Sequence, residues 1–267
     1  MAFWLFASAS ALYGGAAAFS LISLRRGGAG EGAPFVAILF SGLALHTLAM
    51  GILWAGASRA PFANAYELME AVSWATALVA LAAAALARIR VAPSLASGVA
   101  CVLAALPLFC PAFMAGMGRP DGISVDYAVS HAFLAVLSYA FLGFSFVFSV
   151  MYVLQLRFLK RKEGGALARS LMPLPRLVSF ARWSLGLACA AMALSLSLGL
   201  AAAPGVSMDA VHAVKFACGA LLFLLMLGLL VFAARRAPEP LVFARLCALL
   251  FLFAIVLIVP ISIRSFI

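Results

Sequence analysis

Charged residues are scarce in this 267-residue chain, and charge is what a water-soluble fold needs on its surface. Only 10% of the residues are charged, whereas 67% are hydrophobic. A soluble domain has about 25% charged residues, so these few cannot cover a water-soluble globule. The hydrophobic residues instead form runs of about 20, long enough to cross ~30 Å of hydrocarbon as helices. We therefore predict an all-α polytopic integral membrane protein embedded in a lipid bilayer.

Motifs of redox and catalytic chemistry are also missing. The five cysteines form neither CxxC nor CxxCH, so the chain is neither a c-type cytochrome nor an obvious thiol oxidoreductase. It has no nucleophile–base pair, metal-ligand cluster or phosphate loop, which favours an accessory role over an ordinary enzyme while leaving enzymatic activity open. The net charge of +10 does not indicate nucleic-acid binding, because the basic residues lie in short clusters between apolar runs.

Eight apolar runs predict a bundle of about eight transmembrane helices, forming a single membrane domain over residues 1–267. Their ranges are 3–24, 35–56, 65–87, 92–115, 128–156, 183–204, 211–234 and 240–262. The fourth contains Pro107 and Pro111, so we expect a kink or break near its outer end. No basic residue precedes the first run, which is typical of a retained span rather than a cleaved signal peptide.

The distribution of basic residues predicts the orientation. Of the 18 Lys and Arg residues, all but four fall on one face, and the four are Arg59, Arg119, Lys215 and Arg264. Because cytoplasmic loops are rich in Lys and Arg, both termini are expected outside, in a multi-pass protein of the bacterial inner (plasma) membrane. The longest cytoplasmic loop is the basic segment 157–182. It carries either inside-facing charge with a short helix on the headgroups, or a docking surface for a cytoplasmic partner.

Histidines are the candidates for cofactor binding, because an ionisable group inside a membrane needs a partner or a function. His46 lies midway along the second span, where it either hydrogen-bonds a neighbour or ligates heme or another metal. His131 begins the fifth span, with Ser138 on the same face and Tyr139 beside it. It could equally be an interfacial histidine anchored by headgroups.

The third histidine, His212, begins the seventh span and follows Asp209 by three residues. Asp209 could orient the imidazole or simply cap the helix. Helical rise places His46 ~15 Å from the outer end of its span, whereas His131 and His212 are near the surface. Since two axial ligands of one iron lie about 4 Å apart, His131 and His212 could share a heme if their spans are neighbours. His46 would need another partner, for which Met226 is a candidate.

The outer start of the third span combines several functional-type residues. Pro61 rigidifies the approach, and Asn64 is placed to cap the helix. Glu67 and Glu70 lie in the first turns, where the helix dipole favours negative charge, and Trp74 follows Glu70 by one turn. A purely structural helix start also explains this pattern. The outer cations Arg59, Arg119 and Lys215 could pair with heme propionates, with the outer acids or with lipid phosphates.

Two stretches resemble the cytochrome c assembly family (CcsA/HemX type). The first is Pro61-Phe62-Ala63-Asn64-Ala65-Tyr66-Glu67 through Ser73-Trp74, similar to the family's P-x-x-N-x-Y-E…S-W. The second is His131 through Ser138-Tyr139-Ala140, similar to its H-x6-S-Y-A helix. The resemblance implies binding of heme b and its delivery at the outer face for attachment to apocytochrome c. It implies that His46 is the histidine within the membrane and His131 the first external one.

The chain departs from the family at its tryptophan-rich loop. Where the family has W-G-x-x-W-x-W-D-P-K, this chain has Gly205-Val-Ser-Met208-Asp209-Ala-Val-His212, which keeps only the aspartate. The sequence therefore predicts a divergent member that handles heme with another cytochrome c maturation membrane protein, and no metal site apart from the heme iron. The alternatives are a HemX-type membrane regulator of heme synthesis and a non-catalytic subunit of a larger membrane complex.

Overall fold

Helices make up all the regular structure that is described. The computed structural model describes residues 2–26, 32–57, 65–85, 91–109, 126–162, 165–202, 210–236 and 238–264. Its helices are α1 (Ala2–Arg25), α2 (Ala33–Ala57), α3 (Ala65–Ala85), α4 (Ala92–Phe109), α6 (Asp126–Arg161), α7 (Ala166–Ser170), α8 (Leu174–Ala202), α9 (Ala210–Arg236) and α10 (Pro240–Arg264). The all-α fold class is therefore confirmed.

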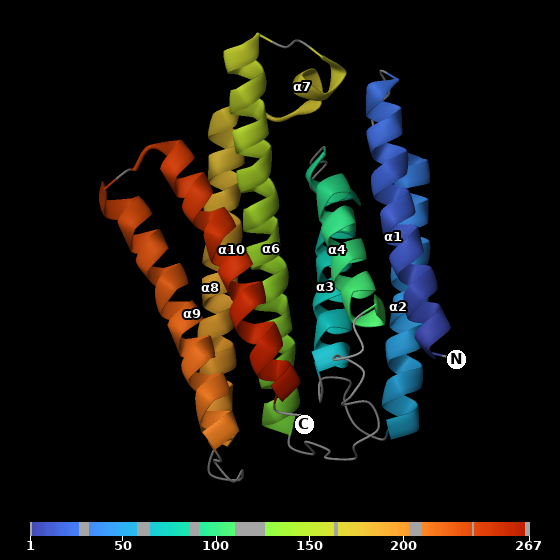
Figure 1. Cartoon of the computed structure of the whole chain (residues 1–267), viewed down its shortest axis with the longest axis vertical. Helices are drawn as coiled ribbons and strands as arrows, with labels where there is room; N and C mark the ends of the chain where they lie inside the picture. The colour runs from blue at the N-terminus through green and yellow to red at the C-terminus, as the bar shows by residue number, and fades with distance from the viewer. Residues whose placement is uncertain are drawn as a thin grey trace.

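The long helices run up and down along one axis in two groups (Figure 1). Helices α1 to α4 form one group, and α6, α8, α9 and α10 form the other. Helix α6 joins the groups, since it packs against α3 and α4 as well as against α8. The chain begins and ends at the same end of the bundle, shown at the bottom of Figure 1. The other end holds most of the arginines and lysines, and we call it the basic end.

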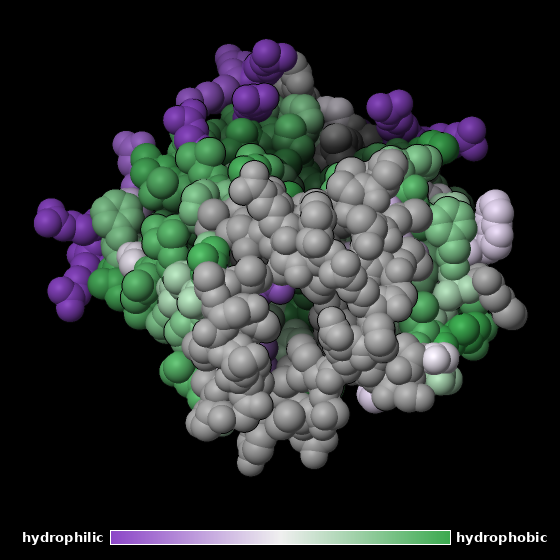
Figure 2. Space-filling view, turned by 60° about the horizontal axis from the view of Figure 1, so that its bottom comes forward, coloured by the Kyte–Doolittle hydropathy of each residue, from purple (hydrophilic) through white to green (hydrophobic). Residues whose placement is uncertain are grey.

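The surface fits a membrane environment. Seven described helices, α1 to α4, α6, α8 and α9, are long and apolar enough to cross a bilayer. Helix α10 has 25 residues, but the structure describes its side chains only as far as Val256. The flanks are mostly hydrophobic, while hydrophilic residues gather toward the basic end (Figure 2). A polytopic membrane bundle is therefore supported, and an eighth crossing stays a prediction.

A proline lies in the first turn of each long described helix that begins at the basic end. Pro34, Pro93, Pro175 and Pro240 lie in the first turns of α2, α4, α8 and α10. A proline is tolerated there because the first backbone N–H groups of a helix have no intrahelical acceptor. In α8 the Pro173 carbonyl accepts hydrogen bonds from the amides of Arg176 and Leu177, at 3.0 and 3.2 Å. These prolines therefore begin helices rather than interrupt them.

The connection between α6 and α8 is shorter than the predicted loop 157–182. Helix α6 continues to Arg161 and α8 begins at Leu174, nine residues before the predicted span. Pro173 immediately precedes α8, and Pro175 lies in its first turn. Between the two helices lies the short helix α7. The fourth predicted span corresponds to α4, which ends at Phe109 with Pro107 in its last turn; Pro111 and the expected break beyond it lie outside the described residues.

Helices α1 and α2 approach closely at Gly42. A Cβ atom built there would lie 2.9 Å from two ring carbons of Tyr13 and 3.1 Å from the Leu12 Cβ. At Gly51, further along the same helix, no atom outside the local backbone lies within 4 Å. Glycine at position 42 therefore allows the two helices to pack, as small residues commonly do in membrane bundles.

We expect Gly42→Ala to destabilise the bundle by about 1–3 kcal/mol, because overpacking displaces the Tyr13 ring. The matched control Gly51→Ala is expected to be neutral or slightly stabilising, since alanine has the higher helix propensity. Thermal unfolding of the two variants in the same detergent or nanodisc measures the difference. Equal melting temperatures for both variants would contradict the close approach.

Candidate functional site

His131 is fixed to α8 through one of its two ring nitrogens. Its Nδ1 lies 2.7 Å from the Ser195 carbonyl oxygen and 3.0 Å from the Ser195 Oγ. The Ser195 hydroxyl in turn donates a hydrogen bond to the His131 carbonyl oxygen at 2.9 Å. An imidazole that donates from Nδ1 to a carbonyl keeps its lone pair on Nε2, which is the tautomer of a metal-ligating histidine.

The same face of α6 continues as a ladder of hydrogen bonds to α8. Ser138 donates to the Ala188 carbonyl at 2.8 Å, and Ser145 donates to the Ala181 carbonyl at 3.0 Å. His131, Ser138 and Ser145 are each seven residues apart, and their partners on α8 step back by the same interval. Such regular bonds fix the antiparallel register of the two helices. His131 therefore has a structural role besides any ligand it binds.

Gly199 provides the space for the His131 ring. A Cβ atom at Gly199 would lie 3.0 Å from the His131 Nδ1 and 3.1 Å from the ring carbon between the two nitrogens. Because the ring packs directly on the backbone of α8, its position is set by the α6–α8 contact rather than by side-chain freedom.

His46 lies in a second polar cluster, inside the α1–α4 group. Its Nδ1 is 3.1 Å from the Tyr13 hydroxyl, and its Nε2 is 3.4 Å from the Glu70 Oε2. The His46 and Glu70 side chains are 0% and 1% exposed. Phe6 packs edge-on against His46 with ring centroids 5.2 Å apart. Both nitrogens of His46 thus face protein groups, and iron could reach Nε2 only if Glu70 moved away.

Several polar atoms of this second cluster have no hydrogen-bond partner. The His46 Nε2, the Tyr66 hydroxyl and both carboxyl oxygens of Glu70 are buried without a hydrogen-bond partner. Tyr66 lies one helical turn before Glu70 on α3, and its ring also contacts Phe6, with centroids 5.7 Å apart. Buried polar groups are nearly always satisfied, so these atoms indicate that a ligand or water completes the site.

The stagger of the helices explains how Glu70 meets His46. Glu70 is only five residues from the start of α3, whereas His46 is eleven residues from the end of α2. Helix α2 extends beyond the start of α3 at this end of the bundle (Figure 1). In the sequence, the position of Glu70 was explained by the helix dipole, which favours a negative charge near the start of a helix. The contact of Glu70 with His46 and the contact of Tyr13 with His46 were not predicted. Glu70 and Tyr13 are both polar groups in apolar runs and therefore needed partners, which is the signal that could have identified them.

The Ser73-Trp74 pair ties α3 to its two neighbours. The Ser73 hydroxyl donates to the Ala100 carbonyl of α4 at 2.8 Å, and the Trp74 Nε1 donates to the Thr47 Oγ1 of α2 at 2.9 Å. Glu67 is buried in the first turn of α3. The described part of the motif thus includes residues that pack the helices together. Pro61 and Asn64 lie outside the described residues.

The structure separates His46 from Met226. Met226 is fully buried in α9, and α9 and α2 stand at opposite sides of the bundle (Figure 1). The suggested axial pairing of these two residues is therefore wrong for this arrangement. Depth along the span, from which the pairing was inferred, says nothing about which helices are neighbours.

His131 and His212 lie at the same end of the bundle, because α6 and α9 both begin there (Figure 1). Helix α6 packs most extensively against α8, whereas α9 packs against α8 and α10. The condition for pairing them, that their spans be neighbours, is not met by any extensive packing of α6 against α9 among the described residues, although both helices pack against α8. The His212 side chain, Asp209, Arg59 and Arg119 lie outside the described residues; Lys215 is half-buried in the second turn of α9. The pairing stays a prediction.

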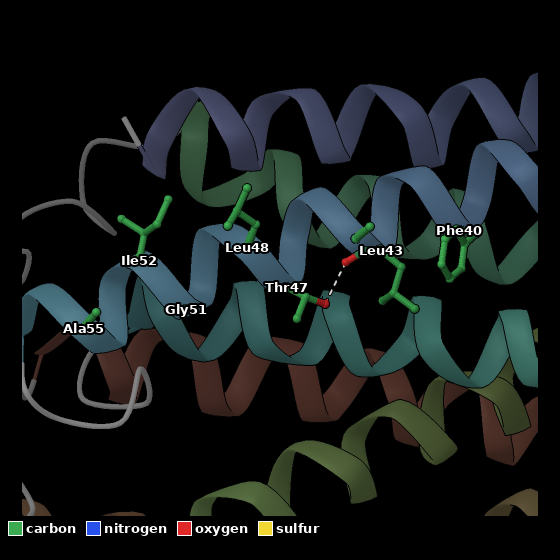
Figure 3. A pocket seen from close by; sticks show the side chains of 8 residues that line it. Phe40, Leu43, Thr47, Leu48, Gly51, Ile52 and Ala55 are labelled. Atoms are coloured by element: carbon green, nitrogen blue, oxygen red, sulfur yellow. Dashed lines mark hydrogen bonds between the residues drawn. The ribbon is translucent and has the colours of Figure 1, made fainter.

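Other parts of the described helices contain fewer groups that could bind a metal ion or a polar ligand. No group of three or more His, Cys, Asp or Glu side chains that could hold a metal ion occurs among the described residues. An open groove follows the outward face of α2 (Figure 3). Its lining residues are Phe40, Leu43, Ala44, Thr47, Leu48, Gly51, Ile52 and Ala55. Thr47 is the polar one, and its hydroxyl already donates to the Leu43 carbonyl, so the groove suits lipid chains.

Comparisons with known protein families and with curated proteins found no match to this chain. Any functional assignment therefore rests on its residues and their arrangement: a histidine with one anchored nitrogen at the end opposite the basic residues, and a buried Tyr13–His46–Glu70 cluster within the bundle.

Proposed function

We propose that this protein serves c-type cytochrome biogenesis by binding or handing over heme at the extracytoplasmic face of the membrane. The observation that carries the proposal is the anchoring of His131, whose Nδ1 lies 2.7 Å from the Ser195 carbonyl oxygen. Ser138 and Ser145 already hydrogen-bond α6 to α8, so this contact does not use the second ring nitrogen of His131. A histidine in this ladder adds an Nε2 that the ladder does not use, and that atom is a suitable heme ligand.

The residues fit heme b unequally. His131 would hold the iron, with His212 as the second ligand and Lys215, Arg59 and Arg119 as the cations for its propionates. When bound, heme supplies the vinyl groups to which apocytochrome thiols attach. His46 is a less suitable ligand, because Tyr13 and Glu70 face its two ring nitrogens. Heme binding is thus proposed at the end of the bundle, not in its middle.

The orientation of the chain follows from its charges. Apart from Lys215, the described arginines and lysines of α1, α6, α8 and α9 lie at the basic end, which we assign to the cytoplasm. The opposite end, with both termini and His131, then faces the extracytoplasmic side of a bacterial inner membrane. With α10 included, the chain crosses the membrane eight times. Because it has no CxxC motif to keep apocytochrome thiols reduced, it acts as an accessory protein beside another maturation membrane protein.

The absorption spectrum of the purified protein tests heme binding, and deletion of the gene tests its purpose. We expect a Soret band from b-type heme, and loss of covalent heme staining in membranes of the deletion strain. A protein that neither retains nor takes up added heme would contradict the proposal. Normal covalent heme combined with altered tetrapyrrole levels would instead favour the HemX-type regulatory function.

A further inference from the structure

We propose that Tyr13, His46, Tyr66 and Glu70 form a buried proton-loading site within the α1–α4 group, which takes up and releases one proton from the side of the bundle opposite the basic residues. The site is distinct from the proposed heme ligands, and the inference does not depend on heme. It rests on the contacts, the burial and the position of these four side chains.

The contacts form a continuous polar path between three helices. Tyr13 of α1 meets the His46 Nδ1 at 3.1 Å, and the His46 Nε2 lies 3.4 Å from the Glu70 Oε2. Tyr66 is one turn from Glu70 and shares its face of α3. An ionisable pair inside a membrane is costly, and such His and carboxylate chains are typical of proton relays.

The unsatisfied atoms indicate that water enters the cluster. Both Glu70 oxygens, the His46 Nε2 and the Tyr66 hydroxyl have no hydrogen-bond partner and are shielded from solvent. A buried water typically makes about three hydrogen bonds, so one or two waters would satisfy these atoms. Water between Tyr66 and Glu70 would also give a proton a route to the carboxyl group.

The chemistry favours a proton over a metal ion. Only His46 and Glu70 offer strong ligands here, and no larger His, Cys, Asp or Glu group occurs among the described residues. With one proton shared between the Glu70 carboxyl and the His46 Nε2, the pair is neutral whichever group holds it. The Nδ1–H of His46 then donates to the Tyr13 hydroxyl oxygen. Release transfers that proton to water and leaves one negative charge on the Glu70 carboxylate.

The site lies nearer to one end of the bundle than to the other. Tyr66 and the buried Glu67 lie in the first turn of α3, at the end opposite the basic residues. Toward the basic end, the core beyond Tyr13 contains apolar side chains such as Ala16, Leu39 and Phe35, and the buried hydroxyls of Ser20 and Ser94 there bond each other. A path that stops at Tyr13 loads a proton but does not conduct it across the membrane.

Neighbouring helices bring few other titratable groups to this cluster. From α4 comes Cys101, whose sulfur lies near Ser10 on α1. From α6 comes Tyr139, which packs against the same core as Tyr66. Neither carries a charge that would fix the proton on Glu70 or His46, so the occupancy of the site is set mainly by the pair itself.

Infrared difference spectroscopy of the whole protein in lipid nanodiscs tests the proposal. The pH is changed between about 5 and 10, a range that includes the ordinary titration of histidine. We expect difference bands of carboxyl and imidazole groups. In Glu70→Gln the carboxyl band and the His46 contribution to the imidazole bands should be lost, whereas the contributions of His131 and His212 remain. The control Glu239→Gln makes the same chemical change at an exposed site at the start of α10, and should leave them unchanged.

A further variant keeps the test decisive if Glu70→Gln does not fold. Tyr66→Phe removes one hydroxyl, and it should slow the appearance of the bands several-fold without reducing their amplitude. Labelling glutamate carboxyls with ¹³C in the unmodified protein identifies the glutamate contribution. Difference spectra of the unmodified protein without a glutamate band, or identical spectra with and without Glu70, would overturn the proposal in favour of a static buried pair.

Discussion

His131→Ala is expected to remove most of the heme absorbance of the purified protein. The substitution deletes the Nε2 that we assign to iron, and no other described side chain near it offers an imidazole. Loss of one axial ligand from a site with two should shift the Soret band of any remaining heme and greatly weaken its retention. Absorption spectra of the variant, before and after heme is added, measure both effects.

Three substitutions on α8 separate ligation from packing. Ser195→Ala should retain heme, because the acceptor at 2.7 Å from Nδ1 is the backbone carbonyl, which the variant keeps. Gly199→Ala should weaken heme binding, because its Cβ would lie 3.0 Å from the His131 Nδ1. Ser197→Ala is the matched control, since its hydroxyl donates only to the Ala193 carbonyl of its own helix. Unaltered heme spectra in both His131→Ala and Gly199→Ala would exclude His131 as a ligand.

Glu70→Leu and His46→Leu are each expected to destabilise the bundle by about 3–5 kcal/mol, because each leaves the other member of a buried pair without its partner. The two side chains are 1% and 0% exposed, so bulk solvent reaches neither of them. The double variant should lose much less stability than the two single variants added together. Replacing both polar groups by apolar ones leaves no buried polar group without its partner. Thermal or denaturant unfolding in detergent measures this double-mutant cycle.

The matched control for this cycle is Ser41→Leu. Ser41 is on the same helix as His46, but it is exposed and donates to the Ala37 carbonyl of its own helix. Its replacement should change stability little. If the losses in the two single variants simply add in the double variant, His46 and Glu70 do not interact energetically.

The positions of the helices could be predicted well from the sequence. The predicted span 3–24 corresponds to α1 over Ala2–Arg25, and 35–56 corresponds to α2 over Ala33–Ala57. These limits follow from the length of apolar runs, which is a local property of the chain. The start of α8 was predicted nine residues late, because the helix begins with a segment that contains Arg176 and Arg182 and precedes the apolar run.

The composition of the candidate sites was less predictable. The sequence indicated His131 with Ser138 on one face of α6, and the structure adds Ser195 and Gly199 of α8, which are more than 60 residues away. It indicated His46 and Glu70 separately, but neither their contact nor the hydrogen bond from Tyr13, which involve three different helices. Partners on different helices depend on packing and stagger, and neither leaves a local pattern in one sequence.

The all-helical class, the apolar spans and the unequal distribution of positive charge are properties of the chain that can be recognised without its fold, because a bilayer requires satisfied backbone hydrogen bonds and long hydrophobic segments. The contact of Glu70 with His46 depends on where α3 begins relative to α2, and the contact of Ser195 with Nδ1 of His131 depends on where α8 packs. The physical reason is that these contacts depend on how whole helices pack, through close approaches such as Gly42 against Tyr13. The same packing places Met226 far from His46 and turns both nitrogens of that histidine toward protein groups.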